Sequence, residues 1–483
     1  MAEGFGGSAD GLATARPEQQ VAIAPAESAL RAHLAAIARS EALPPKMTAR
    51  RVPGLLQWIG AALLLAGAAW CFREKPLLTF DLLGAFCWVS FLMIVMWRFV
   101  LVISGAWLRL FPRRYEAVDA GSEDYPIYTV MIALRDEAQM MDQLAFSLRA
   151  LEWPENRLEV LLLVEADDEE TRQSALQADF PIGTKVLTVP PGRPLTKPRA
   201  LNYGLAHATG TFLTIYDAED RPHPSQLQAA FEAFRSVPPD VICLQAPLKA
   251  TNGAASWVAA QWALEYDVQF NLYLPALAAW DQPIMLGGTS NHFRREDLVA
   301  FGGWDAWNVT EDADLGLRAA RLGARTMTIR PPTLETAPES FSVWFNQRSR
   351  WIKGYMQTWL VCMRTPLRLI LQLGIANWIS LQMTLGASIV SALLYGPMLL
   401  WVLACVFLPG LQADPVTIAL FSFGWLGCAL ADILAPGRWR FARCVAVLTR
   451  PFYWPLQMLA ALAAVYGLVV QPHFWAKTPH KPE

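Results

Sequence analysis

The sequence predicts an α/β domain with a mostly parallel sheet, embedded in an α-helical membrane protein. Strand-like and helix-like segments alternate over residues 125–340, and long apolar runs lie on both sides of this region. Of the 483 residues, 54% are hydrophobic and 17% are charged, which is too apolar for an ordinary soluble enzyme. Strands that alternate with helices pair in parallel, and the helices cover both faces of the sheet.

The charge and the cysteines exclude other classes of protein. A net charge of −2 argues against nucleic acid as the main partner. The seven cysteines include no Cys-x-x-Cys pair, so neither a zinc site nor a disulfide framework is expected. Several of them lie in apolar runs and are expected to be reduced and buried.

The first 108 residues are expected to form a tail and two membrane helices. Residues 1–51 are rich in Ala, Gly, Glu and Pro, which predicts a disordered tail. Two apolar runs within 52–108 are each long enough to span a bilayer. Arg98, in the second run, either snorkels toward an interface or marks the end of the span. Basic residues flank the pair, so the positive-inside rule places the tail and the chain after residue 108 in the cytoplasm.

The α/β region places acidic residues at three predicted strand ends. Strands are predicted at 127–134, 158–164, 185–189 and 211–216, and helices at 137–151, 197–207 and 312–322. Because the carboxyl ends of parallel strands meet at one edge of a sheet, where ligands bind, these acids are expected to lie together. The three groups are Arg135-Asp136-Glu137, Glu165-Ala166-Asp167-Asp168 and Asp217-Ala218-Glu219-Asp220.

The third acidic group has two interpretations. An apolar run stops at Asp217, and Pro222 prevents the strand from continuing. Acids after a strand can form a solvated turn. Crowded carboxylates can instead hold Mg²⁺ or Mn²⁺ shared with a diphosphate. The acids at the other two strand ends favour the cation.

The chain after the α/β region returns to the membrane. Residues 341–370 carry aromatic and basic side chains at helical spacing, which predicts amphipathic helices at the membrane interface. Apolar runs at 378–408, 416–435 and 452–470 predict three or four spans within 371–472. The number depends on Pro397, which leaves the first run as one kinked helix or two short ones. Residues 473–483 form a tail whose side of the membrane is left open.

An ordered set of motifs between residues 125 and 359 resembles the inverting family 2 glycosyltransferases, in the membrane-embedded branch of cellulose synthase and bacterial β-glucan synthases. Lys197-Pro-Arg-Ala-Leu-Asn202 resembles a Lys-x-x-x-x-Asn segment, and Asp217-Ala-Glu219 stands in place of Asp-x-Asp. Thr310-Glu311-Asp312 matches Thr-Glu-Asp, and Gln347-Arg-Ser-Arg350-Trp351 matches Gln-x-x-Arg-Trp. Asp136 departs from the family pattern, which has Asn before Glu137.

The resemblance implies a GT-A-like, Rossmann-type catalytic domain on the cytoplasmic side of a multi-pass inner-membrane protein. It implies inverting transfer from a nucleotide sugar, for which UDP-glucose is the donor it suggests, onto a growing β-linked polysaccharide. Processive synthesis coupled to export is the leading expectation. One alternative is transfer of a single sugar to a lipid, and another is an inactive membrane scaffold or transporter. Membrane lipids are expected partners, and accessory subunits are left open.

The resemblance also assigns the candidate site residues. Asp312 is the expected base for the acceptor hydroxyl, although Thr310 could make it a mere helix cap, and Asp314 is the rival carboxylate. Catalytic candidates are Asp312, Glu311 and Asp217. The nucleotide-sugar candidates are Glu137, Asp167, Asp168, Lys197, Asn202, Asp217, Gln347 and Arg350. The acceptor candidates are Trp351, Thr310 and Trp304, and the last could instead be core. Mg²⁺ or Mn²⁺ is expected at Asp217, with Glu219 and Asp220 as alternative further ligands.

Overall fold

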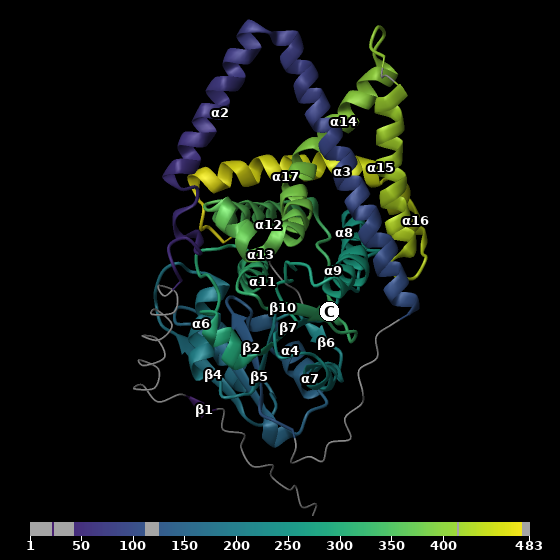
Figure 1. The fold of residues 1–483 in the computed structure, drawn as a ribbon. Helices are drawn as coiled ribbons and strands as arrows, with labels where there is room; N and C mark the ends of the chain where they lie inside the picture. The colour runs from purple at the N-terminus through teal and green to yellow at the C-terminus, as the bar shows by residue number, and fades with distance from the viewer. Residues whose placement is uncertain (1–21, 24–42, 112–124, 413–414, 476–483) are drawn as a thin grey trace, which may run out of the picture.

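The computed structural model describes residues 22–23, 43–111, 125–412 and 415–475. An α/β domain lies at one end, helices that run across the molecule form a middle layer, and upright helices form the other end (Figure 1). The eight-stranded sheet has the order β1-β4-β3-β2-β5-β9-β7-β10. Its strands are β1 (Ala22–Ile23), β2 (Tyr128–Leu134), β3 (Leu158–Glu165), β4 (Thr184–Val189), β5 (Phe212–Tyr216), β7 (Val241–Gln245), β9 (Asn291–Arg294) and β10 (Arg325–Thr328).

The predicted GT-A-like α/β fold with a mostly parallel sheet is confirmed. Among the described strands of the eight-stranded sheet, only β9 runs antiparallel, to β5 and to β7. Every residue of β3 and of β5 is buried, because helices cover both faces of the sheet. The covering helices are α4 (Met141–Arg149), α5 (Glu169–Gln177), α6 (Lys197–His207), α7 (Gln226–Ser236) and α10 (Arg295–Ala300). A second sheet of β6 (Arg221–Pro222), β11 (Thr333–Glu335) and β8 (Leu248–Ala250) extends the fold.

The register of the sheet brings the acidic strand ends to one edge. Leu134 pairs with Val164, and Ile132 pairs with Tyr216, so β2, β3 and β5 all end on the same side. Further helices close over that side. They are α8 (Trp257–Val268), the π-helical turn η5 (Gln269–Tyr273), α9 (Leu274–Ala279) and α11 (Glu311–Arg321).

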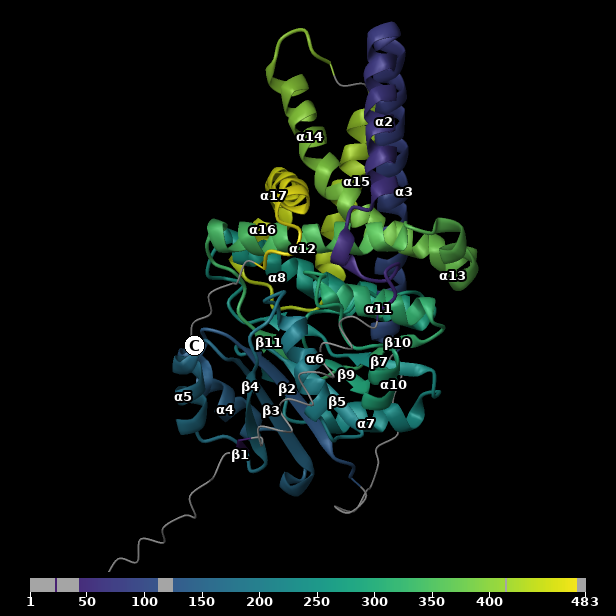
Figure 2. The same cartoon turned by 90° about the vertical axis from the view of Figure 1, so that its left-hand side faces the viewer.

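Five stretches of the described chain are long and apolar enough to cross a membrane, which indicates a membrane protein: Leu55–Glu74, Pro76–Leu110, Pro366–Phe407, Pro415–Leu434 and Arg450–Val470. Helices α2 (Leu55–Glu74), α3 (Pro76–Leu110), α14 (Ala387–Phe407) and α15 (Pro415–Leu434) stand upright (Figures 1 and 2). Across them lie α12 (Phe341–Cys362), α13 (Pro366–Leu381) and α17 (Arg450–Val470), with η6 (Gln382–Gly386) before α14 and α16 (Phe441–Leu448) before α17.

Two features of the membrane part concern the directions of its helices. No break occurs at Pro397, which lies inside α14; the chain changes direction earlier, between α13 and α14. The run predicted as a span at 452–470 is α17, which lies almost perpendicular to α14 and α15 in Figure 1. Its small side chains Ala460, Ala461 and Ala464 are buried with residues of α12 and α14.

The predicted disordered tail does not extend to residue 51. Thr48 Oγ1 donates to Asp305 Oδ1 at 2.8 Å, and Ala49 is fully buried. Arg364 donates to the carbonyl oxygen of Thr48 at 2.8 Å. These long-range contacts hold residues 43–52 against the α/β domain and α12. The prediction for residues 1–21 and 24–42 falls outside the described residues.

Candidate active site

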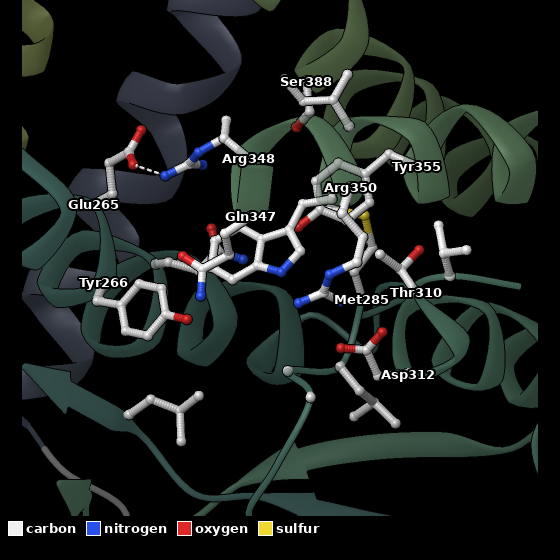
Figure 3. Close-up of a pocket in the computed structure, with 18 of the residues that line it drawn as sticks. Glu265, Tyr266, Met285, Thr310, Asp312, Gln347, Arg348, Arg350, Tyr355 and Ser388 are labelled. Atoms are coloured by element: carbon white, nitrogen blue, oxygen red, sulfur yellow. Dashed lines mark hydrogen bonds and ion pairs between the residues drawn. The ribbon is translucent and has the colours of Figure 1, made fainter. Parts of the chain in front are cut away.

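One cavity of about 1160 Å³ lies between the acidic edge of the large sheet and the helices above it. Figure 3 shows side chains of the α/β domain and of α12 pointing into it from opposite sides. The cavity continues upward to side chains of α3, α14, α15 and α17. The catalytic-domain edge and the membrane helices therefore share one chamber.

Asp217, directly after β5, faces the cavity beside a buried lysine. Lys197, the first residue of α6, forms an ion pair with Asp217 and donates to the carbonyl oxygen of Gly288 at 2.7 Å. Burial lowers the pKa of Lys197, but the carboxylates of Asp217 and Glu311 outweigh burial, so its pKa is raised overall. The ammonium group is therefore a permanent positive charge beside the carboxylate.

Asp220 serves the turn after β5. Its carboxylate accepts hydrogen bonds from the Asp217 backbone N–H at 2.7 Å and from the Thr289 hydroxyl. Burial and the neighbouring carboxylates of Asp217 and Glu219 raise its pKa well above its ordinary value. Asp217 and Glu219 both line the cavity, whereas Asp220 is not among the lining residues.

The donor set at this edge suits Mg²⁺ or Mn²⁺. Asp217 and Glu219 offer carboxylate oxygens to the cavity, and Glu335 of β11 lines it beside them. Within the described chain, no three His, Cys, Asp or Glu side chains are arranged as a complete metal site. The two carboxylates of Asp217 and Glu219 suit a Mg²⁺ ion whose other ligands are phosphate oxygens and water.

The nucleotide-side candidates divide into two groups. Glu137 and Lys197 line the cavity. Asp168 does not; it caps α5, accepting from the Thr171 N–H at 3.1 Å, and it also accepts from the Asp136 N–H at 2.5 Å.

Three more candidates also lie outside the cavity lining. Asp167 is exposed and pairs with Arg135 at 3.2 Å. Asn202 donates to the carbonyl oxygen of Trp304 at 2.7 Å and accepts from its N–H at 3.0 Å. Trp304 itself is fully buried in the core. Asn202 therefore positions a loop, and Trp304 fills the interior rather than the cavity wall.

Asp312 presents a free carboxylate oxygen to the cavity. It lies at the start of α11, and its Oδ1 atom is buried without a hydrogen-bond partner among the described residues. Burial raises its pKa, opposed by the Ala313 N–H, Lys197 and Arg350. The rival carboxylate of Asp314 accepts from Arg318 at 3.3 Å and does not line the cavity.

Glu311 and Thr310 complete the Thr-Glu-Asp motif. Glu311 is 3% exposed, and burial, together with the charge of Asp312, raises its pKa to about 8. Thr310 lines the cavity and touches α12, where a Cβ added at Gly354 would lie 2.3 Å from Thr310 Oγ1. Gly354 therefore allows α12 to approach the motif closely.

Helix α12 supplies the opposite wall through Gln347, Arg350 and Trp351. Arg350 points toward Asp312 in Figure 3, and its Nε atom has no hydrogen-bond partner among the described residues. Gln347 Oε1 accepts from Trp262 Nε1 at 3.2 Å. Trp351 stacks on Tyr266 with ring centroids 6.1 Å apart and planes 16° apart.

Comparison with known proteins identifies this region. Residues 126–354 match the model of the family described as glycosyltransferase like family 2. They form a family 2 glycosyltransferase domain.

Relatives of the whole chain are distant. The probable glycosyltransferase YdaM of Bacillus subtilis is 24% identical over 250 residues, which are 48% of this chain and 56% of YdaM. The beta-monoglucosyldiacylglycerol synthase of Synechocystis is 26% identical over 298 residues, 59% of each chain. Glucomannan 4-beta-mannosyltransferase 7 of Arabidopsis thaliana is 22% identical over 410 residues, 79% of this chain and 70% of that protein.

Among solved structures, the mannosyltransferase PcManGT of Pyrobaculum calidifontis, in complex with GDP-mannose and Mn²⁺, has a TM-score of 0.48 and 17% identity. The match covers 80% of this chain and 99% of PcManGT. The chain spans little more than half the length of the first curated relatives it matches, 53–59%.

The glycosyltransferase domain also uses residues that sequence reasoning missed. Glu165 lines the cavity and pairs with Arg199, although acids two and three residues later were preferred. Glu335, Glu265 and Tyr266 line the cavity from segments in which no motif was recognised. Glu165 belonged to a recognised acidic strand end, whereas the other three become visible only once the chain has folded.

The C-terminal segment returns to the glycosyltransferase domain. Lys353 Nζ donates to the carbonyl oxygens of Gln471 and Phe474 at 3.1 and 2.8 Å. The guanidinium of Arg350 lies 4.6 Å from the ring centroid of Trp475. Residues 473–475 thus line one side of the cavity.

Proposed function

We propose that this protein is an inverting membrane glycosyltransferase that moves a hexose from a nucleotide sugar to a hydroxyl group presented from the membrane. UDP-glucose is the donor that the family resemblance suggests. The observation that carries the proposal is the single cavity, which runs from Asp217 and Asp312 to the lower ends of the upright helices. A site for a water-soluble acceptor would not need a wall made of apolar helices.

The chemistry follows from the two walls of the cavity. The acceptor hydroxyl oxygen attacks the anomeric carbon, the bond from that carbon to the diphosphate breaks, and the hydroxyl proton passes to Asp312. The raised pKa of Asp312 suits a base, because burial makes its carboxylate more ready to take the proton. Lys197 and Arg350 place positive charge where the diphosphate departs.

A divalent cation fits the same edge. Asp217 and Glu219 would hold Mg²⁺ or Mn²⁺, with Asp220 fixing the turn that carries them. When bound, the cation supplies Lewis-acid stabilisation of the leaving diphosphate. Glu137 and Glu165 lie at the neighbouring strand ends and are placed to contact the nucleoside.

The extent of the cavity favours a lipid acceptor and a single transferred sugar. Its lining residues on α14 and α15 lie in the halves nearest the glycosyltransferase domain: Ser388, Ser391, Ala392, Tyr395, Cys428, Ala431 and Asp432. An export path through the helices after residue 378 could use aromatic and polar side chains for stacking or hydrogen bonding to the sugars. Of five such side chains, Trp378, Gln382, Tyr395, Trp401 and Trp425, the cavity lining includes Tyr395 alone. A polar polymer needs a path across the whole hydrocarbon layer.

Processive synthesis of a β-linked polysaccharide is the second candidate, and one observation favours it. Trp351, Tyr266 and Trp262 form a stacked aromatic wall within the site region, and flat aromatic faces suit pyranose rings. Relatives named as glucomannan mannosyltransferases and a cellulose synthase catalytic subunit are also similar to this chain. An inactive scaffold is less well supported, because Asp217, Asp312 and Arg350 all face the cavity.

Incubation of membranes with labelled nucleotide sugars tests the proposal. We expect label in a lipid that dissolves in organic solvent, no label with Asp312→Asn, and a requirement for Mg²⁺ or Mn²⁺. Label in long retained chains supports the second candidate. No transfer from any nucleotide sugar by the wild-type protein overturns the enzyme assignment.

We further propose that the glycosyltransferase domain faces the cytoplasm of a cell whose inner membrane holds the protein. Basic residues flank the upright helices, and nucleotide sugars are made in the cytoplasm. Labelling with a membrane-impermeant thiol reagent tests this in a variant stripped of its seven native cysteines. A cysteine introduced near residue 440 should react only after the cells are opened.

A further inference from the structure

Arg98 points from the membrane helix α3 into the shared cavity. Its Nη2 atom donates to Ser391 Oγ of α14 at 3.0 Å, and its guanidinium lies 5.7 Å from the ring centroid of Tyr395. All three residues line the same cavity as Asp312. Arg98 is therefore turned inward between helices rather than outward along a lipid-facing surface.

The other cations at this end of the cavity have anionic partners. Arg348 forms an ion pair with Glu265, and Arg450 forms one with Asp432 at 3.1 Å. Within the part of the chain that the structure describes, no carboxylate forms an ion pair with Arg98. Arg98 therefore lacks an ion-pair partner of its own among apolar helices, where a buried charge is costly unless a ligand or a polar partner neutralises it.

Tyr395 gives independent evidence for a missing polar group. Its side chain is 5% exposed, and its hydroxyl has no hydrogen-bond partner among the described residues. Buried hydroxyls in proteins nearly always have partners. Arg98 and the Tyr395 hydroxyl line one cavity, and among the described residues neither pairs with a carboxylate. Both fit an oxygen-rich anion, since Arg binds phosphate with paired donors.

We propose that Arg98, Ser391 and Tyr395 form an anion subsite that holds the phosphate of a hydroxyl-bearing membrane lipid, whose hydroxyl group is the acceptor at Asp312. The inference rests on the proposed function for the acceptor role, whereas the subsite itself rests on the geometry alone. A lipid is favoured over a free anion because the subsite lies between α3 and α14. Both helices carry exposed apolar side chains, such as Val100 and Leu400.

The first experiment measures binding without catalysis. The Tm of the purified full-length protein is measured in a neutral detergent with short-chain phosphatidylglycerol, with diacylglycerol, or with inorganic phosphate. We expect phosphatidylglycerol to raise the Tm of the wild-type protein, and Arg98→Gln to weaken its apparent affinity by about tenfold or more. Arg98→Lys should restore part of the affinity, because it keeps the charge and loses the paired donors.

Other outcomes of the binding experiment overturn the proposal. If phosphatidylglycerol raises the Tm of Arg98→Gln as much as that of the wild-type protein, the proposed subsite is wrong. If inorganic phosphate raises the Tm as much as phosphatidylglycerol does at the same concentration, the subsite binds free anions and the lipid assignment is wrong. Tyr395→Phe deletes only the hydroxyl and should reduce the Tm increase caused by phosphatidylglycerol less than Arg98→Gln does. This second variant tests the subsite even if Arg98→Gln fails to fold.

The second experiment tests the acceptor role in vesicles of phosphatidylcholine with either phosphatidylglycerol or diacylglycerol added. With a labelled nucleotide sugar, Arg98→Gln should raise the KM for phosphatidylglycerol about tenfold and leave the KM for the donor unchanged. Transfer to diacylglycerol alone, unaffected by the substitution, would reject the subsite and keep the enzyme. If phosphatidylglycerol raises the Tm of the wild-type protein but the protein transfers no sugar, the proposed function is wrong and the subsite stands.

Discussion

The two ends of the cavity are built in different ways. At the donor end, Glu137, Glu165 and Asp217 follow neighbouring strands whose register fixes them at one edge. At the membrane end, Arg98 and Tyr395 come from helices almost 300 residues apart in the chain. The donor end is therefore set by local strand geometry, and the membrane end by how distant helices pack.

The comparison separates residues that act on the ligands from residues that hold the fold. At the donor end, Asp168 and Asp220 satisfy backbone N–H groups beside the residues that line the cavity. At the membrane end, Glu265 and Asp432 neutralise arginines. The donor end thus has acids of both kinds, and the variants below distinguish them.

The largest expected effect is at Asp312. Asp312→Asn should lower kcat by roughly 1,000-fold, within the range for a general base, and change donor affinity little. Single-turnover transfer and donor binding are the measurements. Asp314→Asn is the matched control, because Asp314 contacts Arg318 outside the cavity; it should lower Tm and leave kcat nearly intact. Equal losses of kcat in both variants would contradict the assignment.

The next effect should appear at the donor end. Asp217→Asn should weaken donor binding and raise the Mg²⁺ concentration required, with a loss in kcat/KM of at least about 10 to 100-fold, the loss seen even for outer-shell partners of a metal. Titration calorimetry with the nucleotide diphosphate measures this. Asp220→Asn should mainly lower Tm, because its carboxylate accepts from Thr289 and the backbone. If Asp217→Asn and Asp220→Asn lose donor binding equally, the distinction between a cation ligand and a residue that holds the turn is wrong.

A smaller effect is expected at the aromatic wall. Trp351→Ala should raise the KM for the acceptor roughly tenfold, because a stacked aromatic contact contributes about 1 kcal/mol beyond its buried area. The donor KM should stay unchanged. Trp351→Phe retains a flat ring and should recover most of the affinity. A shortened product in the Ala variant would instead support the polysaccharide candidate. A raised donor KM would contradict the assignment of Trp351 to the acceptor.

The smallest effect concerns pH and Glu311. Its pKa is raised by burial to about 8 in the folded protein, so between pH 4.5 and 8 the folded state binds more protons than the unfolded state. This group therefore lowers stability as pH rises through that window. Glu311→Gln should remove the dependence, so the Tm of the variant minus that of the wild type should increase from pH 5 to pH 8. A difference in Tm that stays constant would contradict the buried, neutral carboxyl.

Local patterns in the sequence were enough to predict strands β2 to β5 and helices α4, α6 and α11 of the glycosyltransferase domain, but not strands β7 to β11. The helix predicted at 197–207 is α6, and the strand predicted at 158–164 is β3 with one residue added. These segments are predictable because hydrophobic periodicity, Pro198 at a helix start and an acid at a strand end act over a few residues. The enzyme class was also predictable, because its motifs are short and occur in a fixed order.

Tertiary structure alone decided which side chains reach the cavity. The sequence could not distinguish Glu165 from Asp167 and Asp168, because all three lie at the end of one strand and only the turn conformation selects the residue that faces the cavity. The sequence also could not predict that Arg98 points inward or that residues 473–475 contact α12, because those contacts join segments far apart in the chain. Periodicity describes neighbours along the chain, whereas the acceptor end of this cavity consists of neighbours in space.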